Sequence, residues 1–216
     1  MKYWLQIDKD GRPCHSLPKL LAIWLLMSGS VHAQEESLLR YTARPLVWED
    51  FRGSVPDPKP VQMNAATRTS IRISFRYRTL ARSNRIYLEV TEVSVFAVFL
   101  RDKSWVDGRV NKRLLDHEQG HFDNAHIFAL KAQKKFDEVL KGRKKIRVSG
   151  TSNSKVMKLR EAEIDKILQP FVRELAEEDV RYDQVTNHGR RMDVQAEERK
   201  MHARLLKEQT GDASQE

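Results

Sequence analysis

Hydrophobic and polar side chains alternate along residues 67–78, where Ile, Ile, Phe and Tyr are separated by Arg and Ser. This period of two residues is typical of a β-strand with one buried face. The pattern returns over residues 86–99, but its apolar face shifts by one residue around Glu92, which indicates a β-bulge. Residues 81–84 separate the two stretches and predict a turn. We therefore expect an antiparallel hairpin.

A helical period of 3.6 residues replaces the alternation in the second half of the chain. It predicts a helix over about residues 109–141 that ends near Gly142, and a second long helix over about 151–182. Pro170 is expected to kink the second helix. A last, strongly charged helix is predicted over about residues 190–208.

The loop between the first two predicted helices is short, so these helices should pack antiparallel. The end of the second helix would then lie beside the start of the first. The expected fold class is α+β, with a small antiparallel sheet packed on one long helix and on a second, antiparallel long helix.

Residues 1–33 have the layout of a signal peptide. A basic leader precedes the apolar run 20–27, and Val31-His32-Ala33 places small residues at the cleavage positions. The apolar run is far shorter than the roughly 20 residues that span a bilayer. We therefore expect export to the periplasm or medium, with Gln34 as the new N-terminus and no transmembrane segment left. A retained membrane anchor is the alternative.

Removal of the leader would leave one domain over residues 34–210 and a disordered tail over 211–216. Cys14 is the only cysteine and lies in the leader, so the mature chain would have no disulfide and no thiolate ligand. The 39 Lys and Arg residues exceed the 30 Asp and Glu residues, for a net charge of +9. These charges are spread along the helices, which argues against specific nucleic-acid binding and leaves weak attraction to anionic envelope surfaces.

The first predicted helix carries the spacing H-E-x-x-H at His117, Glu118 and His121. Residues four apart share one face of a helix, so the two imidazoles can meet on one metal ion. Two imidazoles, a third ligand and a water are typical of catalytic zinc, which is the expected cofactor. Glu118 points into the middle of the apolar stripe of this helix, where a carboxylate is costly unless it is paired or functional. We therefore expect Glu118 to be the general base that deprotonates the water, and not a ligand.

The helical wheel also sorts the neighbouring polar residues. His126 and Asp123 lie opposite His117, and we expect them on a solvated face. Asn124 lies near the ligand face and is a candidate hydrogen-bond partner behind the ligands.

The third metal ligand is expected from residues 182–189, which antiparallel packing would bring beside the histidines. His188 is preferred because it sits at a chain break before Gly189 and histidine is the commonest neutral zinc ligand. Tyr182 is a candidate catalytic donor to the oxyanion. Three carboxylates remain as alternative ligands: Asp183, Glu174 and Glu178.

Four motifs occur in this order: Trp48-x-x-Phe51-x-Gly53, Ser104-Trp105-Val106, Leu115-x-His117-Glu118-Gln119-Gly120-His121-Phe122-Asp123 and Tyr182-Asp183-x-x-Thr186-x-His188-Gly189. Together they resemble a family of bacterial proteins catalogued as predicted secreted zinc-dependent proteases, over roughly residues 45–195. The resemblance implies a minimal zincin-like fold, a zinc site and peptidase activity. The chain departs from the family at Arg199, where the resemblance leads us to expect Trp.

The expected function is a secreted or periplasmic zinc metallopeptidase with a protein or peptide substrate. Two alternatives remain: a non-catalytic zincin-like protein that binds a metal or an envelope partner, and a zinc amidase that acts on cell-wall peptides. In zincin-like folds an exposed strand edge beside the metal can pair with an extended peptide. The 67–99 hairpin is the expected source of that edge.

Overall fold

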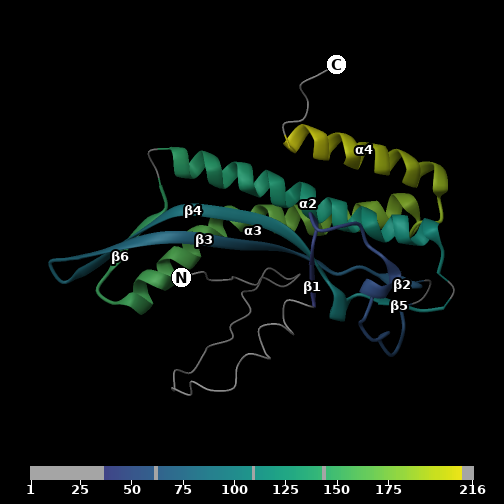
Figure 1. The fold of residues 1–216 in the computed structure, drawn as a ribbon, viewed down its shortest axis with the longest axis horizontal. Helices are drawn as coiled ribbons and strands as arrows, with labels where there is room; N and C mark the ends of the chain where they lie inside the picture. Colours follow the sequence, from purple (N-terminus) through teal and green to yellow (C-terminus); the bar gives the residue numbers. More distant parts are fainter. Residues whose placement is uncertain (1–36, 61–62, 109, 143–144, 211–216) are drawn as a thin grey trace.

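A long β-hairpin forms the middle of the main sheet in the computed structural model (Figure 1). Strand β3 (Thr69–Arg82) pairs antiparallel with β4 (Arg85–Leu100) through a turn at Ser83 and Asn84, both with positive φ. Two left-handed residues suit a tight hairpin turn because their twist matches that of the strands. The register shifts where Arg76 pairs with Glu92 but Tyr77 pairs with Val90. The predicted hairpin and bulge are both confirmed.

The structure describes residues 37–60, 63–108, 110–142 and 145–210. The predicted signal peptide over 1–33 and the predicted tail over 211–216 therefore lie outside the described residues. Among the described helices, none is long and apolar enough to span a bilayer.

Strand β4 is central, because β1 (Leu38–Arg40) and β6 (Arg147–Gly150) both pair with its second edge. Between these two short strands, the Gln133 side chain accepts a hydrogen bond from the Val95 N–H at 2.7 Å and donates to the Val93 carbonyl at 3.1 Å. An amide from the neighbouring helix thus satisfies backbone groups that no strand reaches. The sequence patterns did not predict β1 or β6.

Three helices account for the second half of the described chain: α2 (Lys112–Lys141), α3 (Asn153–Thr186) and α4 (Met192–Thr210). Asn111 caps α2 by accepting a hydrogen bond from the Leu114 N–H, and Ser152 caps α3 in the same way. Pro170 lies inside α3, which is continuous through it.

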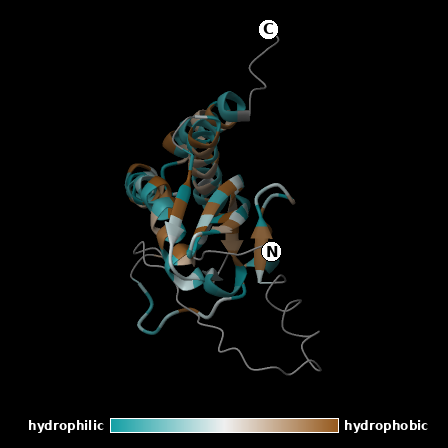
Figure 2. Ribbon diagram, turned by 90° about the vertical axis from the view of Figure 1, so that its left-hand side faces the viewer, coloured by the Kyte–Doolittle hydropathy of each residue, from teal (hydrophilic) through white to brown (hydrophobic). Residues whose placement is uncertain are grey.

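Helices α2 and α3 pack against the same face of the sheet, while α4 packs on α2 (Figure 1). Phe122 of α2 contacts Phe99 of β4, and the Arg160 guanidinium of α3 lies over the ring of Phe75 in β3. Burial of each such aromatic side chain contributes about 1.5–3 kcal/mol. Figure 2 shows the resulting brown hydrophobic stripes on the sheet and helices. This arrangement confirms the predicted α+β class.

A second, two-stranded sheet lies near the start of α2 and joins β2 (Ala65–Ala66) to β5 (Trp105–Val106). The short 3₁₀ helix Trp48–Asp50 precedes it, and Gly53 donates its N–H to the Ser104 carbonyl at 2.8 Å. A Cβ on Gly53 would lie only 2.8 Å from that oxygen, so the close approach requires glycine. These contacts bring the two tryptophan motifs together beside the helix that carries H-E-x-x-H.

Candidate metal centre

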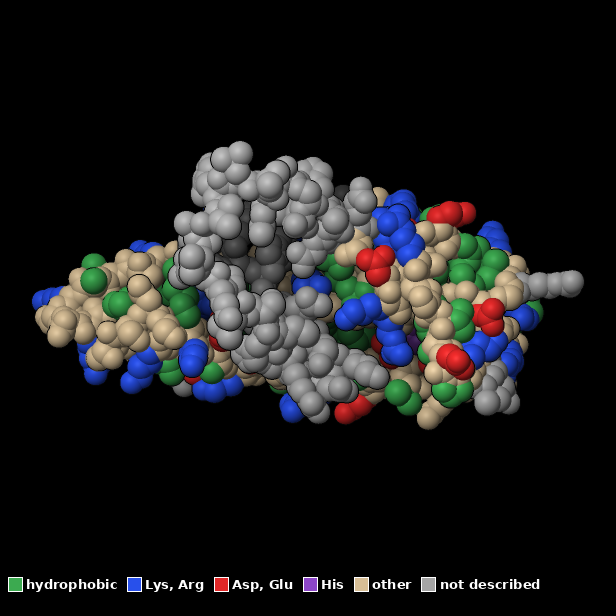
Figure 3. Space-filling view, turned by 90° about the horizontal axis from the view of Figure 1, so that it is seen from below, with side chains coloured by type: hydrophobic (Ala, Val, Ile, Leu, Met, Phe, Trp, Pro, Cys, Tyr) green, Lys and Arg blue, Asp and Glu red, His purple; other side chains and the backbone are tan. Residues whose placement is uncertain are grey.

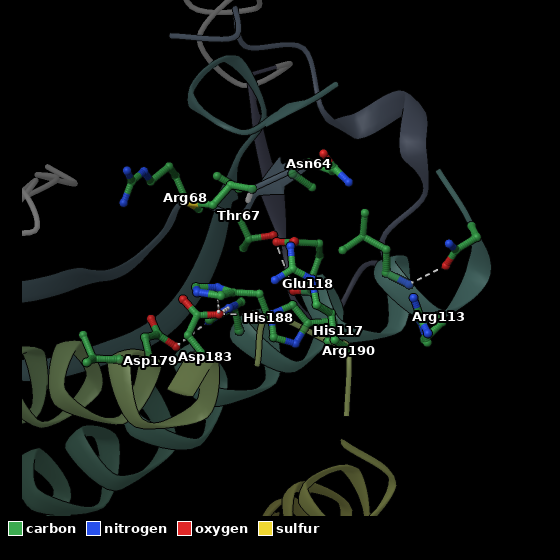
Figure 4. A pocket seen from close by; sticks show the side chains of 18 of the residues that line it. Asn64, Thr67, Arg68, Arg113, His117, Glu118, Asp179, Asp183, His188 and Arg190 are labelled. Carbon is green, nitrogen blue, oxygen red and sulfur yellow. Dashed lines mark hydrogen bonds and ion pairs between the residues drawn. The ribbon is translucent and has the colours of Figure 1, made fainter. Parts of the chain in front are cut away.

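His117 and His121 lie one turn apart on α2 and point at the same carboxylate of α3, Asp183. Figure 4 shows His117 beside Asp183. The Nε2 atoms of His117 and His121 lie 3.0 and 3.1 Å from Oδ1 of Asp183. His117 is only 2 % exposed. The antiparallel packing of α2 and α3 therefore brings the predicted segments together, although their sequence separation exceeds 60 residues.

Each histidine also has a partner for its other ring nitrogen. His121 Nδ1 lies 3.0 Å from Oδ1 of Asp179, and Asn124 donates to that same oxygen at 3.2 Å. His117 Nδ1 lies 3.5 Å from the Thr186 hydroxyl. A partner at Nδ1 fixes the ring and leaves the Nε2 lone pair for a metal. Asn124 thus lies where the sequence predicted a partner behind the ligands.

The charges of this cluster are strongly coupled. Burial alone would lower the pKa of His121, but Asp179 and Asp183 outweigh it and raise that pKa well above its ordinary value. Burial alone would raise the pKa of Asp183, but hydrogen bonds and charge from His117 and His121 hold it well below its usual range. The centre therefore favours an ionised carboxylate facing positive charge, which a divalent cation can supply in place of protons.

The donor set fits a metal ion. One ligand atom from each of His117, His121 and Asp183 lies within 4.8 Å of the other two. Two imidazole nitrogens and one carboxylate oxygen can hold a divalent transition metal such as zinc, with coordination left open to water.

His188, the ligand preferred from the sequence, lies at the rim of this group. Its Nδ1 is 3.3 Å from Oδ1 of Asp183, and its side chain is 40 % exposed. The backbone of Asn187, His188 and Gly189 is left-handed, which ends α3 and turns the chain back over α2. A Cβ on Gly189 would lie 3.0 Å from Cβ of His117, so this close approach favours glycine.

The other alternative carboxylates lie elsewhere. Glu174 is exposed on α3. Glu178 belongs to a second cluster with Glu198 and His202, where Arg181 forms hydrogen bonds to both carboxylates at 2.5–3.0 Å. The arginine already supplies the positive charge that a cation would bring to that cluster.

Glu118 lines a cavity of about 380 Å³ together with the histidines, Asp183 and residues 63–68. It is only 3 % exposed, and within the described residues its carboxylate has no hydrogen-bond or ion-pair partner. Figure 4 shows Glu118 between Thr67 and the histidines. A carboxylate that faces a cavity beside candidate metal ligands, without a partner among the described residues, is in the condition expected of a functional group.

The cavity wall opposite α2 comes from β2 and its flanking residues, and not from the hairpin predicted to supply it. Residues 63–68 line the cavity, whereas β3 begins at Thr69. The prediction of a 67–99 edge was therefore wrong except at Thr67 and Arg68. A two-residue strand such as β2 has too little alternation to be seen in a sequence.

Tyr182 packs behind the histidines and does not line the cavity. Its ring stacks on His117 with centroids 4.8 Å apart and meets His121 edge-on at 5.2 Å. Its hydroxyl is buried and has no hydrogen-bond partner in the described part of the chain, and burial raises its pKa. A Cβ on Gly120 would overlap this hydroxyl, so glycine between the two histidines makes room for the tyrosine.

Tyr182→Phe separates the packing of Tyr182 from the predicted oxyanion role. Removing an unpartnered buried hydroxyl should change the free energy of unfolding by less than about 1 kcal/mol and leave metal binding intact. Tyr182→Ala should cost on the order of 3–5 kcal/mol because it leaves a cavity behind both histidines. Thermal melting and metal titration measure both effects. A large loss of hydrolysis in Tyr182→Phe at unchanged metal content would instead support the oxyanion role.

No protein-family model, curated protein or solved structure matches this chain.

The sequence analysis did not identify Asp179 as a site residue, and it assigned no role to Thr186 or Gly120. The first had a signal, because Asp179 and Asp183 are four apart on α3 and so share a face, as His117 and His121 do on α2. The other two depend on side-chain packing across the helix pair, which no spacing reveals.

The prediction that Asp123 lies on a solvated face of α2 is wrong. Asp123 is buried, where it accepts hydrogen bonds from Tyr41 and Gln119 and pairs with Arg199 of α4. His126 is half-buried and stacks on Tyr41, with ring centroids 4.0 Å apart. The wheel placed both residues away from the metal ligands, but α4 and Tyr41 cover the face it left to solvent.

Proposed function

We propose that this protein is an exported zinc-dependent peptidase in which Glu118 is the general base. The observation that carries the proposal is the Glu118 carboxylate, which is nearly buried, has no partner among the described residues and lies in the same cavity as a converging His-His-Asp set. A protein that only bound a metal would have no use for such a carboxylate, because it contributes no ligand and costs free energy where it lies.

His117, His121 and Asp183 would hold the zinc, with His188 beside them at the rim. When bound, zinc supplies Lewis acidity, which lowers the pKa of a water and polarises a carbonyl. The Glu118 carboxylate takes the proton from the attacking water and delivers it to the leaving nitrogen. Asp179 holds His121, and Thr186 holds His117, in the required orientation through the Nδ1 atom of each ring.

A peptide substrate is supported by the strand that borders the cavity. Within the described residues β2 pairs on one side only, with β5, while Asn64 to Thr67 line the cavity. An extended peptide laid along this segment can gain main-chain hydrogen bonds and present one of its amide bonds to Glu118. The cell-wall amidase alternative uses the same chemistry on a peptide of different composition.

Export is part of the proposal and rests on the leader sequence of residues 1–33 and on the family resemblance. Without a cysteine after the leader, the site relies on imidazole and carboxylate ligands, which an oxidising compartment does not damage.

The test begins with protein recovered from the envelope or medium, whose sequence should start at or near Gln34. Metal analysis should give one zinc per chain. A broad screen of peptides and cell-wall fragments should show amide cleavage that a chelator removes and added zinc restores. Zinc-loaded protein that cleaves nothing in this screen would favour the non-catalytic alternative, and a full-length cytosolic protein would contradict export.

A further inference from the structure

The far end of the β3–β4 hairpin is separate from the metal centre and has an unusual surface. We call residues 78–89 the hairpin tip. It extends beyond the helices at the left of Figure 1, and residues 78–82 of β3 are all exposed. Leu80 is 64 % exposed and Tyr87 is 43 % exposed. Large apolar side chains on a protruding strand pair are a liability in water unless another surface covers them.

The register places these side chains on one face. Leu80 pairs with Tyr87, and the pairs on either side of it, Arg78 with Glu89 and Arg82 with Arg85, are two residues away along the strands. Side chains two apart point to the same side of a sheet. An aliphatic–aromatic pair is thus flanked by arginines, beside a hollow of about 520 Å³ that Arg147 also borders. Figure 3 shows blue basic and green hydrophobic side chains intermingled at this end.

The hairpin tip has too few acidic side chains to neutralise the positive charge of its arginines. Glu89 is the only acidic residue of the tip, and it already contacts Arg78 at 3.2 Å, Arg147 at 2.7 Å and Lys145 at 3.7 Å. Arg82 and Arg85 lie directly opposite one another and have no acidic partner within the described residues. Like charges in directly opposed positions destabilise a strand pair, so this arrangement costs free energy in the isolated protein.

We propose that the hairpin tip docks on a lipid bilayer that contains anionic headgroups. Arg82 and Arg85 would contact lipid phosphates, while Leu80 and Tyr87 would enter the interfacial layer, where tyrosine is favoured. Nucleic acid or an anionic polysaccharide would use the arginines but would leave the Leu80–Tyr87 pair exposed. The apolar pair therefore favours a membrane over these polymers. The inference does not depend on the metal centre or on catalysis.

The test is co-sedimentation of the chain from Gln34 to Glu216, which contains every described residue, with phosphatidylcholine vesicles with and without phosphatidylglycerol. The wild type should partition onto the anionic vesicles, and Arg82→Glu with Arg85→Glu should weaken partitioning roughly tenfold or more. Lys134→Glu with Arg173→Glu is the matched control, because it makes the same charge change at exposed helix positions. An equal loss in both double variants would overturn the proposal, since net charge alone would explain it.

Leu80→Ser distinguishes a bilayer from a soluble polyanion at constant charge. It should weaken binding to anionic vesicles severalfold and leave binding to heparin unchanged. Equal vesicle binding by Leu80→Ser and wild type would make the tip a general polyanion site and overturn the membrane assignment. Thermal melting checks folding. Arg82→Glu alone should melt no lower than wild type, because it replaces a repulsive pair with an attractive one.

Discussion

Glu118→Gln is expected to lower the rate of peptide hydrolysis by about a hundredfold to ten-thousandfold while zinc stays bound. The glutamine amide has nearly the same size and shape as the carboxylate but cannot accept the proton of the attacking water. Because no ligand atom is removed from His117, His121 or Asp183, the metal content should match that of wild type. Single-turnover cleavage and metal analysis on the same preparation measure the two quantities separately.

Glu138→Gln provides the matched control, since it makes the same chemical change on α2 at an exposed position whose one ion-pair partner within the described residues is Lys135. It should behave like wild type in both assays. Loss of zinc in Glu118→Gln would identify Glu118 as a ligand, and undiminished cleavage with full zinc would show that another group removes the proton.

Asp183→Ala is expected to weaken zinc binding by at least about a hundredfold, whereas His188→Ala should weaken it less than about tenfold. Substitution of partners behind a ligand typically costs 10–100-fold, and loss of a ligand costs at least as much. Asp183 Oδ1 lies close to both Nε2 atoms, while the side chain of His188 is partly exposed at the rim. Competition with a chromogenic chelator gives both affinities.

Asp193→Ala, at an exposed position near the start of α4, controls for the loss of a carboxylate on this side of the molecule. The opposite order of effects would make His188 the third ligand, as the sequence alone favours. Melting curves of the metal-free proteins identify any variant that fails for lack of folding.

The sequence predicts elements whose periodicity is long enough to be read. The helix expected over 109–141 is α2, and the alternation of 67–78 and 86–99 becomes β3 and β4 with the bulge in place. Strands β1 and β6 contain three and four residues, too few for alternation, and they exist because β4 offers them an edge.

The part of the candidate site that lies on one helix could be predicted from the sequence. His117 and His121 share one face because helix geometry requires it, and Glu118 is buried as its place in the apolar stripe indicates. The sequence does not place Asp183 closer to the histidines than His188, because their positions depend on how the end of α3 is rotated toward α2. Asp123 shows the same limit, since a wheel describes a helix face but not the element that covers it.

The contacts of α4 bear more on the orientation of α2, the helix that carries His117 and His121, than on the stability of the hydrophobic core. Over residues 192–209, the part of α4 whose side chains are described, no hydrophobic side chain is buried, and the buried residues are Gln195 and His202. Gln195 donates to the Arg113 carbonyl and Asp116 of α2, and Arg199 pairs with Asp116 and Asp123. Hydrogen bonds are directional, and those that involve a charged group contribute about 1.5–3 kcal/mol each. Local opening of α4 would leave the hydrophobic core nearly intact but release α2 from contacts that fix its rotation, so the protein can lose the alignment of the candidate metal centre before it unfolds.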